Sequence, residues 1–241
     1  SKLFHVQKDH FYGHAASLVW KQGFEGTPMD LPVEKLARLR TRACVVFPHG
    51  SMSNSPTQVL AIPEKANLGP FTGQLLVGEM NQPRIMRVML EEVGGELQGA
   101  CVPFIDGSPL GRGCNRMDWA PDGSLFVGQT KHTWAGGQGI QRVSWNGKIP
   151  FEIQNMELSE KGFTFTFTQP VDKKSALQKE NWPFKRYFFE YRQAYGSPRS
   201  DEMEVEISKI EISGDDKIVE ISLSELQPWH IHEVNIQNLK T

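Results

Sequence analysis

The segment Gly73–Glu79 reads GQLLVGE and recurs as GSLFVGQ over Gly123–Gln129, at an offset of 50 residues. A second match follows in the same order, since Ile85–Val88 corresponds to Ile140–Val143 at an offset of 55 residues. Each copy predicts a strand, a turn, a strand, a loop and a strand, with a fourth strand after them. Four strands in about 50 residues are typical of one β-propeller blade. Residues 1–150 therefore predict about two four-stranded blades of a partial propeller.

The turns between these strands favour the same interpretation. Pro121-Asp122-Gly123 is a tight-turn tripeptide, because Pro presets φ and Gly accepts a positive φ. Asn146-Gly147 predicts a β-hairpin. Gly78 and Gly128 follow apolar strand cores, where a missing side chain lets neighbouring backbones approach closely. The alternative is an unrelated pair of hairpins, which leaves the shared order of turns and strands unexplained.

After residue 150 the pattern changes to strict alternation of apolar and polar residues. Gly162–Phe167 alternates in this way, which is typical of a half-buried antiparallel strand. Several such strands in about 90 residues favour a β-sandwich over residues 151–241, so that the whole chain is all-β. Further strands are predicted over Met203–Ile212, Ile218–Leu223 and His232–Ile236, and a short helix over Pro32–Leu39.

Composition excludes some classes of protein. The 241 residues carry 26 basic and 28 acidic side chains, and a net charge of -2 leaves no footprint for nucleic acid or an anionic membrane. The most basic stretch, Lys35–Arg42, predicts a solvated face. No apolar run reaches the roughly 20 residues of a membrane span. The chain does not begin with Met, so we expect a mature, trimmed or excised form.

Cysteine is sparse, and there is no C-x-x-C motif and no C-x-x-C-H haem attachment motif. A bridge between Cys101 and Cys114 is one alternative. We favour buried free thiols for these two and for Cys44, because cysteine is often buried as a small apolar residue.

Several segments of residues 1–150 together resemble large secreted propeller proteins of planctomycetes and their relatives. That family is similar to glucose/sorbosone dehydrogenase-like propellers, which use pyrroloquinoline quinone and calcium and are often fused to cytochrome c domains. The resemblance implies a secreted or periplasmic location and a carbohydrate ligand. The matching segments are FYGHAASLVW (11–20), PHG (48–50) with NSP (54–56), GPFTGQL (69–75) and WAPDGSL (119–125).

Residues 151–241 resemble a bacterial Ig-like domain, which implies a spacer or docking role. This resemblance rests on FTFTFTQPVD (163–172), KIVEISL (217–223) and LQP (226–228). Two blades cannot close a propeller, and open blades would leave strand edges exposed. We therefore expect the remaining blades, or a cytochrome c domain, to come from the same or another chain.

Candidate site residues are polar or aromatic and are predicted to lie in loops above the blades, where binding residues gather. His14 is the predicted catalytic base toward a sugar hydroxyl, with bonding to loop backbone as the alternative. Trp134 is predicted to stack on a sugar ring. No metal site is predicted. The predicted ligand-binding residues are His49, Asn54, Arg84, Arg116, Gln129, His132 and Trp134.

Other polar and aromatic residues are predicted to be structural. Arg87 and Arg142 stand at matched places in the two copies, so both are assigned to the architecture. His230 and His232 could meet one metal, but a partly exposed strand face is favoured. An aromatic run is assigned to strand core and interdomain packing: Trp182, Tyr187, Phe188, Phe189, Tyr191 and Tyr195.

Two functions follow from these observations. The first is part of a secreted or periplasmic propeller related to glucose/sorbosone dehydrogenases, which binds or acts on carbohydrate. The alternative is a non-catalytic scaffold module that binds a glycan or a protein, since fold alone does not give function.

Overall fold

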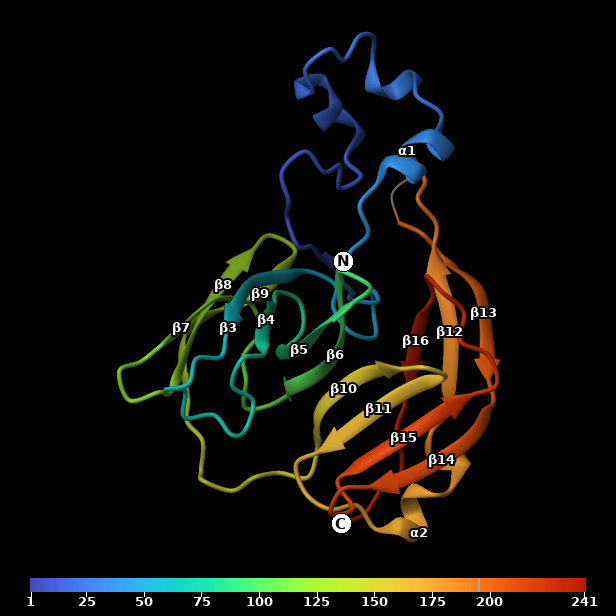
Figure 1. The fold of residues 1–241 in the computed structure, drawn as a ribbon. Coiled ribbons are helices and arrows are strands. Elements are labelled where there is room, and N and C mark those ends of the chain that lie inside the picture. The colour runs from blue at the N-terminus through green and yellow to red at the C-terminus, as the bar shows by residue number, and fades with distance from the viewer. Residues whose placement is uncertain (195) are drawn as a thin grey trace.

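A computed structural model describes residues 1–194 and 196–241 (Figure 1), so Tyr195 lies outside the described residues. The chain is mostly β, with 43% strand and 10% helix, in several small antiparallel sheets of which none is closed. The all-β prediction is therefore confirmed. No helix in the described part of the chain is long and apolar enough to cross a membrane.

The first 46 residues form an extended arm that begins and ends in one short ladder. Strands β1 (Lys2–Leu3) and β2 (Val45–Val46) pair antiparallel. Between them the chain forms two 3₁₀ turns, η1 (Ala15–Trp20) and η2 (Pro28–Asp30), and helix α1 (Val33–Leu39). The predicted helix is thus confirmed. In Figure 1 α1 lies beside the upper end of the C-terminal strands, far from the N-terminal sheets.

Two antiparallel sheets follow. The first sheet has the strand order β3-β4-β5-β6, and the second has the order β7-β8-β9. The bounds are Pro56–Ala61 (β3), Leu75–Glu79 (β4), Arg84–Val93 (β5), Glu96–Asp106 (β6), Cys114–Trp119 (β7), Leu125–His132 (β8) and Ala135–Val143 (β9).

The internal repeat is confirmed at the level of strand register. Leu76 pairs with Arg87 in the first sheet, and the corresponding Phe126 pairs with Arg142 in the second. The prediction of a fourth strand in the second copy is wrong, because this sheet has three strands. The Asn146-Gly147 hairpin is also wrong: Asn146 closes only a local turn, and the chain then enters a different sheet.

The C-terminal half, residues 151–241, contains two further antiparallel sheets that pack face to face. Their strand orders are β10-β11-β15-β14 and β13-β12-β16. The bounds are Ile153–Ser159 (β10), Gly162–Phe167 (β11), Phe184–Phe189 (β12), Arg199–Val205 (β13), Ile207–Ser213 (β14), Ile218–Leu223 (β15) and Ile231–Val234 (β16), with α2 (Lys173–Ala176) and η3 (Lys179–Asn181) between β11 and β12.

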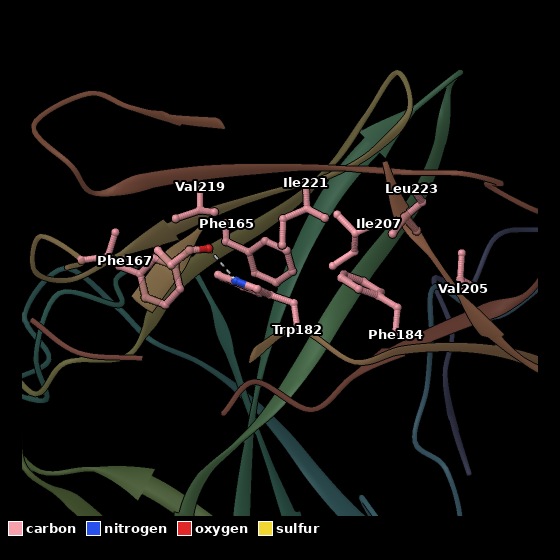
Figure 2. Close-up of a cluster of buried hydrophobic side chains, with 11 residues drawn as sticks. Phe165, Phe167, Trp182, Phe184, Val205, Ile207, Val219, Ile221 and Leu223 are labelled. Carbon is pink, nitrogen blue, oxygen red and sulfur yellow. Dashed lines mark hydrogen bonds between the residues drawn. The ribbon is translucent and has the colours of Figure 1, made fainter. Parts of the chain in front are cut away.

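One apolar core lies between these two sheets (Figure 2). Phe165 and Phe167 of β11 point into it, as the alternation predicts, and Phe184 enters from the opposite sheet. Trp182 is buried among them, and its indole Nε1 donates to the Ala176 carbonyl over 2.9 Å. The predicted single strand over Met203–Ile212 is divided at position 206, so that its two parts belong to opposite sheets.

Arg87 joins the two halves of the chain. Its side chain is fully buried and donates to the carbonyls of Ile153 and Gln154 at the start of β10. Its guanidinium also lies 4.1 Å from the ring centroid of Phe71. The architectural role predicted for this arginine agrees with these contacts. The three cysteines, all within the described residues, are free, so the Cys101–Cys114 bridge is not formed.

Candidate functional site

Three of the predicted binding residues gather around one loop of the first sheet, residues 48–54. Asn54 Oδ1 accepts from the Gly50 amide over 2.8 Å, and His49 is exposed in the same loop. Arg84 donates to the carbonyl of Met52 over 2.8 Å and pairs with Asp106 over 2.7 Å. Its charged group is therefore already engaged in holding the loop.

Four others lie on the second sheet. Arg116 donates to the carbonyl of Asn115, and Gln129 bonds to the side chain of Gln141. The His132 and Trp134 rings lie 5.7 Å apart on the β8–β9 hairpin, and Trp134 is 61% exposed. His14 stands apart from both groups, exposed at the start of η1. The eight predicted residues thus fall in three places rather than in one site, and their roles stay predictions.

A hollow lies between the two halves of the chain, and we call this hollow the cleft. Its volume is about 1320 Å³. It is lined by the arm near β2, by β5, β6 and β10, and by β12 and β16 of the C-terminal half. None of the eight predicted residues lines it within the described chain. The sequence patterns therefore did not indicate this cleft, and a concave surface of this size is a common location for a binding site.

Three cations line the arm side of the cleft: Lys2, Arg40 and Arg42. Desolvation lowers the pKa of each, and the charge of Arg40 further lowers the pKa of Lys2 and of Arg42, although Glu96 acts in the opposite direction on Arg42. None of the three forms an ion pair with a carboxylate of the described residues. They leave a patch of positive charge that an anion would relieve.

Aromatic side chains from the C-terminal half face this cationic patch. Trp229 is 63% exposed, and the guanidinium of Arg42 lies 3.8 Å from its ring centroid. Arg40 lies 5.0 Å from the ring centroid of Tyr191, whose hydroxyl donates to the Gly13 carbonyl over 2.7 Å. A side chain at Gly13 would clash with Arg40, because a Cβ there would stand 2.8 Å from its Cδ.

Carboxylates line the cleft as well, and three of them have partners within the fold. Glu91 accepts from the Leu158 amide over 3.1 Å, and Glu233 accepts from the Tyr187 hydroxyl over 2.6 Å. Burial raises the pKa of Glu152, and Arg87, 3.7 Å away, lowers it. Glu96 and Glu157 also line the cleft, so its positive charge is confined to the patch that Lys2, Arg40 and Arg42 form on the arm side.

His230 precedes β16 and His232 lies within it, and the two side chains contact different partners. His230 Nε2 contacts Asp201 Oδ2 over 3.0 Å, while His232 packs on Phe163 with ring centroids 5.4 Å apart. Burial lowers the pKa of His232, so this ring is neutral near pH 7. No group of three or more metal-ligating side chains gathers anywhere in the described ranges.

Two sequence signals pointed at the cleft but were assigned other roles. The basic stretch Lys35–Arg42 predicts a solvated face, and the aromatic run that contains Tyr191 predicts packing. Both contribute to the cleft. Comparisons with protein-family models, curated proteins and solved structures find no match for this chain. The case for function therefore rests on the residues themselves.

Proposed function

We propose that this chain is a non-catalytic module that binds carbohydrate, and that an acidic glycan occupies the cleft. One observation carries the proposal: three cations without an ionic partner in the described chain line the cleft, and one of them, Arg42, stands over the exposed indole of Trp229. An aromatic face suits the apolar face of a sugar ring, and guanidinium groups suit carboxylate or sulfate. A neutral glycan would leave the charge of the patch unrelieved.

The finer fold assignment belongs to the same proposal. The shared strand register of the two N-terminal sheets supports propeller-type blades. In chain order, β10, β11, β14 and β15 match the A, B, D and E strands of an immunoglobulin-like sandwich, and their sheet order is A-B-E-D. A secreted or periplasmic location follows from the proposed family and is part of the proposal.

Oxidation of a sugar with pyrroloquinoline quinone and calcium stays a prediction from the resemblance. No group of three or more His, Cys, Asp or Glu side chains gathers among the described residues, and we derive no step through either group. Aldose-dependent dye reduction by the chain, supplied with quinone and calcium, would support this enzymatic alternative over a binding role.

The test compares an oligogalacturonate with an uncharged galactan oligomer of equal length by calorimetry. We expect the acidic oligomer alone to bind, and binding to weaken as salt screens the charges. Arg42→Ala and Trp229→Ala should each lower affinity about tenfold, since a charged hydrogen bond and an aromatic stacking contact each contribute ~1.5 kcal/mol. The controls, Arg38→Ala and Trp20→Ala, alter exposed residues outside the cleft. Equal binding of both oligomers, or no effect of either cleft variant, would overturn the proposal.

A further inference from the structure

The two sheets of the repeat have corresponding faces, which the register identifies. Leu76 and Ile85 lie on one face of the first sheet, and Phe126 and Ile140 take their places in the second. We call this side the A face of each sheet. The opposite side, the B face, carries Val77, Met86 and Val88 in the first sheet and Leu125 and Val127 in the second.

The A face of the first sheet is covered by the B face of the second. Leu76 and Ile85 are both 0% exposed, and they share one buried cluster with Leu125 and Val127. The backbones come so close that a Cβ on Gly78 would stand 2.5 Å from the Cys114 carbonyl oxygen. A-to-B packing is therefore the established contact between sheets of this repeat.

Within residues 1–194 and 196–241, no such cover lies over the A face of the second sheet. Phe126 is 40% exposed and Ile140 is 75% exposed, although their counterparts in the first sheet are fully buried. A Cβ on Gly128 would meet nothing closer than the Arg116 carbonyl oxygen of its own sheet, at 3.6 Å. A shallow hollow runs over this face, lined by Gln58, Arg116, Asp118, Phe126 and Ile140.

The polar part of this face is already arranged as in the covered copy. Arg87 donates to the side chain of Gln74, and Arg142 donates to Ser124 Oγ over 2.9 Å, with Gln74 and Ser124 at equivalent positions of the repeat. Arg142, on the same face as Phe126 and Ile140, thus already has a hydrogen-bond partner, Ser124, within its own copy of the repeat. What the second copy lacks is the opposing sheet.

We propose that the A face of the second sheet docks the B face of another sheet of the same repeat, which lies outside residues 1–241. A second copy of this chain does not fit, because neither of its B faces is free. The first is buried against Val45 and Phe47 in one core cluster, and the second against the first sheet. The occupant is therefore an apolar strand pair of the Gly-x-Leu-x-Val-Gly type.

This docking face lies outside the cleft, so the inference does not depend on the proposed glycan binding. Its test places a photoreactive benzoylphenylalanine at Ile140 in the protein assembled in its native cells, and sequences the cross-linked peptides. The matched control carries the same residue at Val6, which is 76% exposed on the N-terminal arm.

Cross-links from position 140 to a peptide with the repeat pattern, absent from position 6, are the expected result. Cross-links to residues 1–241 of a second copy, to a protein without the repeat, or to nothing would each overturn the proposal. Ile140→Arg should leave the melting temperature of the isolated chain unchanged, because the side chain is exposed. In native mass spectrometry, the same substitution should remove the complex between this chain and the protein that supplies the cross-linked peptide. Val6→Arg should leave that assembly intact.

Discussion

Replacing Arg87 with Met tests how the two halves of the chain are held together. Met keeps much of the length of the side chain but removes the charge and all its donors. The carbonyls of Ile153 and Gln154 then lose the guanidinium that they accept from. A buried acceptor without a partner costs about 1–3 kcal/mol. The Gln154 carbonyl still accepts from Gln74 Nε2 over 2.7 Å, so the Ile153 carbonyl is the one that loses its side-chain donor, and we expect the free energy of unfolding to fall by about 1–3 kcal/mol.

The repeat supplies the control, because Arg142 occupies the equivalent position. Its side chain is 50% exposed and pairs with Asp122, which is also half-exposed. Exposed pairs contribute about 0–1 kcal/mol, so Arg142→Met should change stability by no more than that. Urea unfolding followed by tryptophan fluorescence measures both, and hydrogen exchange at the start of β10 locates the loss. Equal effects of the two substitutions would refute the reasoning.

Two further results are expected. Gly78→Ala should lower the melting temperature by several degrees, whereas Gly128→Ala should leave it nearly unchanged. Of these two glycines, only Gly78 has a carbonyl oxygen 2.5 Å from the position that a Cβ would take. Calorimetric scans of both variants measure the shifts, and equal shifts would contradict this explanation. Burial raises the pKa of Cys101 to about 12 and of Cys114 to about 11, so both thiols should be alkylated slowly at pH 8 in the native protein and rapidly in urea. The native rate should rise with pH as thiolate forms, and fast labelling of either residue at pH 8, located by mass spectrometry, would count against the burial argument.

The features that sequence patterns predicted are local ones. Alternation over Gly162–Phe167 fixes which side chains enter the core, and Gly123, with φ 79°, makes the turn that its tripeptide predicts. The Asn146-Gly147 signal failed because turn chemistry does not specify a partner strand. After this turn the chain forms β10, whose antiparallel partner is β11.

The cleft could not be predicted in the same way, because its walls come from segments far apart in the chain. Lys2, Arg42 and Trp229 meet only when the arm lies against the C-terminal half. Likewise, the matched arginines at 87 and 142 look alike in sequence, although one is buried and the other half-exposed. A repeat predicts the positions of its residues but not which copy another sheet covers.

The bond from the Tyr191 hydroxyl to the Gly13 carbonyl spans 178 positions of the chain. During synthesis at about 5–20 residues per second, the arm would wait roughly 10–40 s for this partner to leave the ribosome. The order of translation therefore makes the wall of the cleft that holds Arg40 and Arg42 one of the last parts of the protein to be completed.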